Sequence, residues 1–306
     1  MFPSGQQYAL AFGSQRATVV EVGGGIREYW HGERAVLDPY PADRIADGGH
    51  GVPLIPWPGR VADGRYRFGD HEYQLDLTEP AKHNALHGLM SWRPWRAVER
   101  QEHRVVMTAR LHPQPGYPFA LDATVHYALG SEGLRVRIEV TNIGDAACPF
   151  AAGHHPYLSA GPGHVDEARL TVPAATRIVT DSQRLLPTRR EAVAGTGWDF
   201  RAGRLMGPQH VDDCFTDLDR DSDDRAWIRL EGADGHMAEL WMDRAFPVAC
   251  IYTGDTLEPS RQRLGVAAEP FTVGPNALAT GEGILVLEPG STWVGEWGAC
   301  LDAGRG

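Results

Sequence analysis

Strict alternation of apolar and polar side chains is the feature of this 306-residue sequence that most limits its possible folds. In GLRVRIEVTN (133–142) apolar residues stand at every second position, with Arg135, Arg137 and Glu139 between them. The preceding run ALDATVHYAL (120–129) has the same period, and GSEG forms the junction. A period of two places successive side chains on opposite faces of a strand, so the two runs predict a half-buried antiparallel hairpin.

Two further hairpins follow from the same pattern. YRFGDHEYQLDL (66–77) has Gly69 and Asp70 as its turn, and WIRLEGADGHMAELWM (227–242) turns around Asp234 and Gly235. Short strands of this kind, separated by many of the 36 glycines and 22 prolines, predict an all-β protein with little or no helix. No linker divides the chain, so we expect residues 1–306 to form a single large antiparallel β-sandwich domain.

Composition excludes several partner classes. The formal net charge of -11 argues against nucleic acid, which requires a basic surface. The N-terminus lacks a signal-peptide pattern and no segment is apolar over a membrane-spanning length, so we expect a cytoplasmic monomer or homodimer without a membrane partner. The cysteines are widely spaced and form no CxxC pair, which predicts buried free thiols at Cys148, Cys214, Cys250 and Cys300.

Five polar stretches interrupt the alternating pattern at places where a plain sandwich would not need them. Because sheets bring distant strands together, these stretches could build one concave site. They are IPWPGRVADG with Arg60, HNALHG with His83 and His87, GHHPYL with His154 and His155, VDDCF with Asp212 and Asp213, and AAEPFTVGPNAL with Glu269.

Each stretch also has a purely structural interpretation. A histidine in a β-protein is more often a surface or hydrogen-bonded core residue than a catalyst, and Arg60 could pair with a surface acid. In GHHPYL only one of the two histidines can face a given pocket, because neighbouring side chains on a strand point to opposite sides. Glu269 is the exception, because a carboxylate in a segment that is otherwise apolar needs a partner or a function.

The ordered set of motifs resembles the aldose 1-epimerase (galactose mutarotase-like) family. The resemblance runs from about Trp57 to Trp293 and includes PWPGRVADGRYRFGDHEYQL, NALHG, GHHPYL, VDDCF, EPFTVGPNAL and LEPGSTW. Each motif alone is weak, whereas their common order is specific. The resemblance implies the galactose mutarotase-like supersandwich fold.

The resemblance also assigns roles to single residues. It implies that His155, Glu269 and His87 are catalytic, with Glu269 as the general base and no metal ligand among them. It implies that Arg60, Asp212 and Asn84 bind substrate. Because Asp213 directly follows Asp212, either aspartate could be the one that contacts the substrate. His154 then takes the place of a residue that the family varies. Pro156 and Pro270 stand where some members have serine and glutamine, which leaves the sugar, glucose, galactose or another hexose, undefined.

The implied activity is mutarotation, the interconversion of α- and β-anomers of a hexose by ring opening. One group must take the O1 proton while another donates a proton to O5, so Glu269 and protonated His155 suffice without a cofactor. A carboxylate beside an imidazolium should favour the charged form of both. Trp57, Trp95 or Tyr252 could stack on the sugar.

Three alternatives remain open. A hexose-6-phosphate 1-epimerase of the same fold would need additional cations for a dianion, yet Lys82 is the only lysine, so Arg93 or Arg96 would have to serve. A carbohydrate-binding protein without catalytic activity would not need a paired acid and base. A metal enzyme could use His83, His87, His154 and His155, but the four-residue spacing of His83 and His87 brings two histidines together on a helix, and NALHG, between a strand and a turn, is not expected to be helical.

Overall fold

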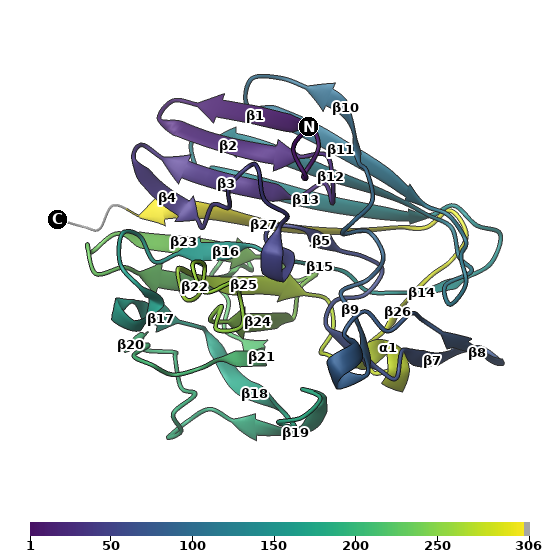
Figure 1. Ribbon diagram of the computed structural model, residues 1–306. Coiled ribbons are helices and arrows are strands. Elements are labelled where there is room, and N and C mark those ends of the chain that lie inside the picture. Colours follow the sequence, from purple (N-terminus) through teal and green to yellow (C-terminus); the bar gives the residue numbers. More distant parts are fainter. Residues whose placement is uncertain (303–306) are drawn as a thin grey trace.

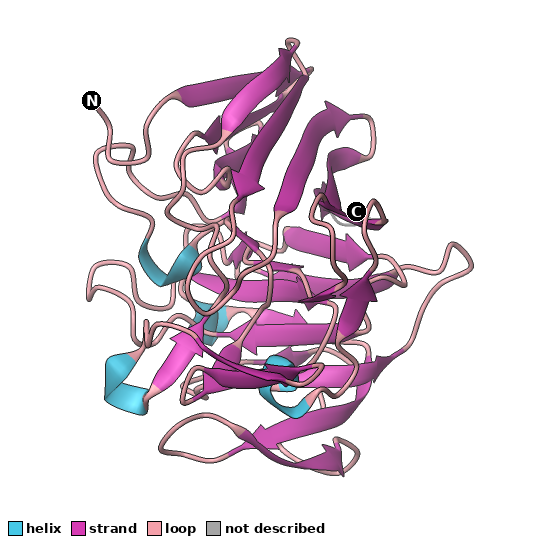
Figure 2. Cartoon of the chain, turned by 90° about the vertical axis from the view of Figure 1, so that its right-hand side faces the viewer, coloured by secondary structure: helices cyan, strands magenta, loops and turns pink. Residues whose placement is uncertain are grey.

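The computed structural model describes residues 1–302, which form an almost entirely β-stranded protein (Figures 1 and 2). Every strand pair in this range is antiparallel, which confirms the predicted fold class. Helical residues are confined to α1 (Ala277–Thr280) and three single turns, η1 (Asp47–Gly49), η2 (Pro80–Lys82) and η3 (Val165–Glu167). No helix in the described part of the chain is long and apolar enough to cross a membrane.

The larger sheet has 12 strands and carries the polar stretches at its centre. Its main path runs β1 (Gln7–Phe12), β2 (Gln15–Val20), β3 (Ile26–His31), β4 (Arg34–Leu37), β16 (Tyr157–Ser159), β25 (Gly265–Phe271), β24 (Val248–Tyr252), β21 (Asp212–Leu218), β18 (Ala174–Thr180) and β19 (Pro187–Ala192). A short branch adds β15 (Gly153–His154), which pairs with β25 and with β5 (Pro53–Leu54).

The second sheet has 9 strands and contains the hairpin with which the sequence argument began. Its order is β10 (Arg96–Arg100), β11 (Arg104–Leu111), β12 (Leu121–Gly130), β13 (Gly133–Asn142), β27 (Thr292–Asp302), β23 (Met237–Met242), β22 (Ala226–Glu231), β17 (Arg169–Thr171) and β20 (Arg204–Leu205). Three two-stranded ribbons complete the fold: β14 (Cys148–Phe150) with β26 (Leu285–Leu287), β6 (Arg60–Ala62) with β9 (Asn84–Leu86), and β7 (Arg65–Phe68) with β8 (His71–Gln74).

All three predicted hairpins form. β12 pairs with β13, β22 pairs with β23, and β7 pairs with β8 across the Gly69–Asp70 turn. Along β12 buried and half-buried residues alternate without exception, as the period of two requires. The local pattern therefore sets both the strands and the face that each one buries.

The two large sheets pack face to face around one hydrophobic core. β12 contacts β1 and β2, while β27 and β23 contact β4 (Figure 1). Fully buried side chains from both sheets meet in this core, among them Val19 and Tyr29 from one and Val136 and Trp297 from the other. Trp57 and Trp95 also lie in this core, so neither is placed to stack on a ligand.

Candidate active site

A cavity of about 550 Å³ opens over the centre of the 12-stranded sheet. This volume lies within the range of small-molecule sites. Among the residues that line it are Arg60, His87, His155, Asp212 and Glu269. The structure thus brings together five of the six predicted site residues, which come from five separate parts of the sequence.

Neighbouring strands explain this convergence. β24 pairs with β25 on one side and with β21 on the other, so Glu269 on β25 and Asp212 on β21 are separated by a single strand of the same sheet. His155 stands between β15 and β16, next to β25. Arg60 and His87 come from the β6–β9 ribbon and the residue that follows it, at the cavity edge.

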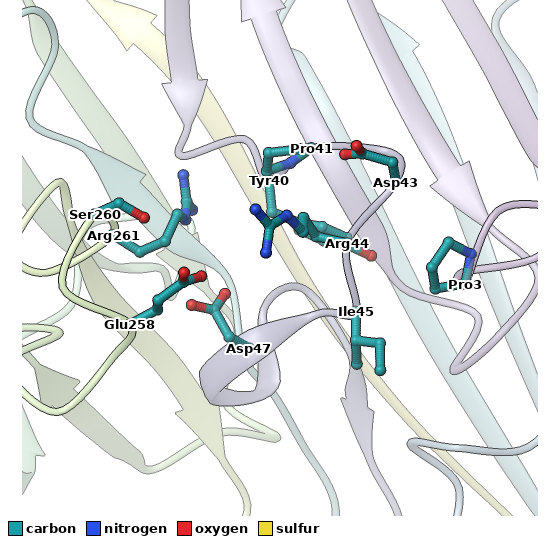
Figure 3. Close-up of a pocket in the computed structure, with 10 residues that line it drawn as sticks. All are labelled: Pro3, Tyr40, Pro41, Asp43, Arg44, Ile45, Asp47, Glu258, Ser260 and Arg261. Atoms are coloured by element: carbon teal, nitrogen blue, oxygen red, sulfur yellow. The ribbon is translucent and has the colours of Figure 1, made fainter.

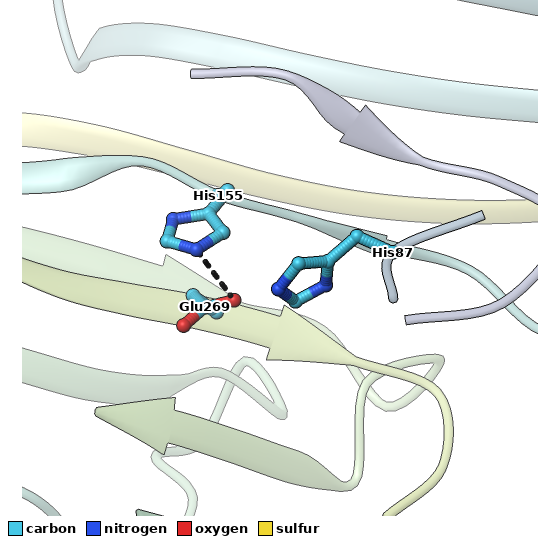
Figure 4. A group of neighbouring side chains, drawn as sticks. All are labelled: His87, His155 and Glu269. Atoms are coloured by element: carbon cyan, nitrogen blue, oxygen red, sulfur yellow. Dashed lines mark ion pairs between the residues drawn. The ribbon is translucent and has the colours of Figure 1, made fainter. Parts of the chain in front are cut away.

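His155 and Glu269 form the chemical centre of the cavity. The His155 Nε2 atom lies 3.4 Å from Glu269 Oε2, and both side chains are about 5% exposed (Figure 4). The pKa of His155 lies well below its usual range. Burial is the largest cause, and the neighbouring His87 and His50 add to it. The pKa of Glu269 lies well above its usual range, mainly because of burial and in smaller part because of the Asp212 charge.

These pKa directions overturn the expectation that pairing favours the charged form of both groups. In this buried setting the cost of removing charge from water exceeds the attraction between the partners. Glu269 Oε2 also has no hydrogen-bond partner among the described residues, and the Arg60 charge, which favours the carboxylate, is outweighed by burial. The two pKa directions thus favour a carboxylic acid beside a neutral imidazole.

His87 contributes a second imidazole, which presents a hydrogen-bond donor to the cavity. Its ring centroid lies 5.3 Å from that of His155 (Figure 4). The backbone N–H of Gly59 donates to His87 Nδ1 at 3.1 Å, so the ring proton of the neutral form is on Nε2. Burial and the Arg60 charge lower the pKa of His87 to about 3, which keeps the ring neutral.

His154 has a structural role in the same motif. Its Nε2 lies 2.9 Å from the carbonyl oxygen of Gly51, and Trp297 Nε1 donates to its Nδ1 at 3.1 Å. The side chain is completely buried, and burial lowers its pKa to about 3. Of the two adjacent histidines, His155 thus faces the cavity and His154 faces the core.

The same alternation separates the two aspartates. Asp212 lines the cavity, where its Oδ2 lies 3.5 Å from the Arg60 guanidinium. Asp213 is buried and accepts a hydrogen bond from Arg177 Nε at 2.7 Å. Asp212 is therefore the one positioned to contact a ligand.

Asn84 is the predicted site residue that the structure does not bring to the cavity wall. Its side chain is fully buried and its amide donates to Glu79 at 3.0 Å and to the Arg184 carbonyl at 2.9 Å. Glu79 in turn accepts from Arg60 Nε at 3.0 Å and forms an ion pair with Lys82. Asn84 thus acts on the cavity through Glu79, while direct contact with substrate remains a prediction.

Sequence reasoning missed several cavity residues. Glu79 was overlooked because the segment TEPAKH is an ordinary charged loop by composition, and only its contact with Arg60 reveals its role. The turn Asp47–Gly49 also reaches the cavity. Tyr252, considered as a stacking residue, does line it.

The cysteine prediction was wrong for two of the four residues. Cys214 and Cys250, directly opposite each other on β21 and β24, form a disulfide that lines the cavity, whereas Cys148 and Cys300 are free, Cys148 buried and Cys300 half-buried. The strand register, which spacing in the sequence cannot give, places these two side chains together.

His87, His155 and Glu269 are the residues that could hold a metal ion, with one ligand atom of each within 4.8 Å of the others. Ligands in a tetrahedral zinc site lie roughly 3.3 Å apart, given bonds of about 2.0–2.1 Å, so the three side chains would have to approach one another. His83, the other histidine of its motif, instead pairs with Asp63 at the surface and His154 is in the core. The four histidines of the metal alternative therefore do not converge.

Comparison with known proteins agrees with this architecture. The family model for aldose 1-epimerase matches residues 6–298. The chain is 33% identical over 297 residues to the uncharacterized protein YihR of Escherichia coli K12, covering 95% of this chain and 91% of that protein.

Two solved structures share the fold. The aldose epimerase homologue from C. elegans has a TM-score of 0.84 at 18% identity and covers 97% of this chain and 98% of its own. The galactose 1-epimerase from Lactobacillus acidophilus NCFM has a TM-score of 0.81 at 20% identity and covers 97% and 94%. With its fold, its cavity and the match along nearly the whole sequence, the chain belongs to the aldose 1-epimerase family.

Proposed function

We propose that this protein is a mutarotase, an isomerase that interconverts the α- and β-anomers of a free hexose with His155 and Glu269 as its acid–base pair. The observation that carries the proposal is the 3.4 Å approach of His155 Nε2 to Glu269 Oε2 inside a cavity of suitable volume. Mutarotation needs one proton removed and one delivered, and this pair can do both without a cofactor.

The resting protonation state sets the order of events. Glu269, as the acid, donates its proton to the ring oxygen O5 while neutral His155 accepts the O1 proton, so the C1–O5 bond breaks and an open-chain aldehyde forms. Rotation about C1–C2 then turns the other aldehyde face toward O5. In ring closure the carboxylate takes the O5 proton and the imidazolium returns a proton to O1, which restores the starting pair. Each group thus serves once as acid and once as base.

The surrounding residues orient the sugar. The His87 Nε2–H group can donate to a sugar oxygen, and the Asp212 carboxylate can accept from hydroxyl groups. Arg60 lies close enough to Asp212 to hold its carboxylate at the edge of the cavity. General acid–base assistance contributes about 10²–10⁴-fold to such a rate, and positioning adds to it.

A phosphorylated hexose fits this cavity less well. Among the described residues, one arginine and one lysine line the cavity, Arg60 and Lys82. Both form ion pairs with Glu79. Arg93 instead donates to the Leu89 carbonyl, and Arg96 lies on an edge strand of the other sheet. A phosphate dianion would need a cation that is free to bind it, which favours an uncharged hexose.

The test is polarimetry of freshly dissolved α-D-glucose and α-D-galactose, with wild type, Glu269→Gln and His155→Gln. We expect the wild type to accelerate mutarotation of at least one sugar and both variants to lose about 10²-fold or more of kcat. Glu102→Gln, at an exposed position, is the matched control and should keep the wild-type rate. Wild-type inactivity on both sugars, with binding detected by calorimetry, would instead indicate a carbohydrate-binding protein.

A further inference from the structure

The orientation of the His155 ring needs an explanation that the active-site contacts do not supply. Catalytic and metal-binding histidines usually have one ring nitrogen held by a hydrogen bond to a carboxylate or carbonyl, which fixes the ring. His155 Nδ1 is buried and has no hydrogen-bond partner within residues 1–302. Some other contact must keep Nε2 directed at Glu269.

His155 belongs to a group of three stacked rings, together with Tyr157 and His50. The Tyr157 ring is 5.1 Å from the His155 ring between centroids, with 16° between their planes. Tyr157 also packs against His50, with ring centroids 3.7 Å apart and 4° between the planes, which is close to parallel. Since all three residues are buried, the stack is part of the packed interior and has little freedom to rotate.

His50 is anchored at both nitrogens. Its Nε2 lies 3.0 Å from Asp38 Oδ2, and its Nδ1 lies 2.9 Å from the Asp47 carbonyl oxygen and 3.4 Å from the Asp47 carboxylate. Acceptors at both nitrogens suit an imidazolium, which has two N–H donors. Although burial alone would lower it, the pKa of His50 is raised by these two aspartates. The Arg261 guanidinium donates to Asp38 at 2.6 Å, and the same nitrogen lies 3.3 Å from His50 Nε2.

The turn that carries Asp47 completes the support. The Tyr157 hydroxyl donates to the Gly48 carbonyl at 2.8 Å. Gly49 has a φ of 72°, and a Cβ atom there would lie 2.8 Å from His155 Cδ2, so only glycine lets the turn sit against this ring edge. The outer side of this cluster borders a surface pocket that includes Asp47 and Arg261 (Figure 3).

We propose that His50 and Tyr157 are positioning residues, which hold the His155 ring with Nε2 toward Glu269 by stacking in place of a hydrogen bond at Nδ1. The proposal rests on the proposed function only for the chemical role of His155. A positive charge on His50 would also oppose protonation of His155, whose pKa is lowered, while Glu269 lies 3.4 Å from His155 Nε2. The stack therefore influences both the direction and the basicity of the catalytic nitrogen.

A matched pair of substitutions separates stacking from simple packing. Tyr157→Phe keeps the ring and removes the hydroxyl, whereas Tyr157→Leu removes the ring. We expect Tyr157→Leu to lower kcat by about 10- to 100-fold with KM within about threefold, since a misplacement of about 1 Å can cost 10²-fold. Tyr157→Phe should lose less, because the ring that stacks with both His50 and His155 is still present.

A second readout does not depend on activity. The ring resonances of His155 can be assigned in a histidine-labelled sample by their disappearance in His155→Gln. We expect Tyr157→Leu to shift them, because the ring current of Tyr157 is removed, and the exposed His112→Gln control to leave them in place. This measurement shows whether Tyr157 stacks on His155 in solution, even if the wild type is no mutarotase, while the kcat comparison tests whether the stack positions the ring.

His50→Gln tests the contribution of the charge on His50. It is also the alternative test of the proposal if Tyr157→Leu does not fold. We expect a lower kcat and, if His50 carries the positive charge that its two aspartates favour, an acidic limb of the pH–rate profile displaced to higher pH when that charge is removed. The proposal is overturned if folded Tyr157→Leu keeps its His155 resonances and kcat, or if His50→Gln keeps both kcat and the position of the acidic limb.

Discussion

His154 should make the stability of this protein fall steeply in mild acid. In the folded state its Nδ1 accepts from Trp297 and its Nε2 contacts the Gly51 carbonyl, so the buried ring has no room for a second proton. Burial lowers its pKa to about 3, while in the unfolded chain an ordinary histidine titrates near about 6.5. Between these two values the unfolded state binds more protons, so stability must decrease as the pH falls.

The size of the effect follows from linkage. Protonation of His154 in the unfolded chain stabilises the unfolded state by RT ln(1 + 10^1.5) at pH 5, where the exponent is the difference between a pKa of about 6.5 and the pH. This is about 2 kcal/mol, whereas at pH 7 the same contribution is only about 0.2 kcal/mol. This result depends little on the folded pKa, provided that it lies well below 5. His154 alone should therefore account for about 2 kcal/mol of the stability lost between pH 7 and pH 5.

The measurement is urea unfolding, followed by circular dichroism, of wild type and His154→Gln at both pH values. His154→Gln should be less stable at pH 7 by about 1–3 kcal/mol, because buried hydrogen bonds are lost, and this gap should narrow by about 2 kcal/mol at pH 5. The other buried histidines are present in both proteins, so their contributions cancel. The variant should keep most of its mutarotation rate. A gap that is the same at both pH values would refute the reasoning.

Three further outcomes are expected. The pH profile of kcat should be bell-shaped, with an acidic limb below the ordinary imidazole range from His155 and an alkaline limb from Glu269, whose pKa is raised; polarimetry in a buffer series will locate both. Asp212→Asn should raise KM with little change in urea midpoint, whereas Asp213→Asn should break the buried pair with Arg177 and cost about 3 kcal/mol in unfolding free energy; the reverse assignment of the two effects would contradict the site. Dialysis against a chelator should leave the mutarotation rate unchanged, because the proposed proton transfers need no metal, and a rate restored only by added metal would count against them.

Much of the fold could be predicted because alternation is a local property. Along 121–142 each side chain is one step from a neighbour on the opposite face, so the pattern itself determined the strands, the turn and the buried side. The candidate residues could be found in the same way, as polar groups such as Glu269 in sequence that otherwise favours burial. The order of these motifs was sufficient to indicate the family.

The tertiary structure decided which face of each strand borders the cavity. Alternation states that His154 and His155, or Asp212 and Asp213, point to opposite sides, but not which side is the core. That depends on which strands lie beside them, and β25 reaches its neighbours β16 and β24 only through pairing of distant segments. The same long-range pairing joins Cys214 to Cys250.

Contacts between segments far apart in the chain also explain the residues that the sequence did not reveal. His50 lies over 100 positions before Tyr157 and His155, and nothing in GGHG distinguishes it from a loop histidine. Asn84 stands in a recognisable motif, yet burial beside Glu79 turns its amide away from the cavity. The sequence by itself determined the strands and the chemical groups available, because both depend on local residue order; packing of the two sheets decided which groups meet, because burial and charge depend on neighbours that only the folded chain brings together.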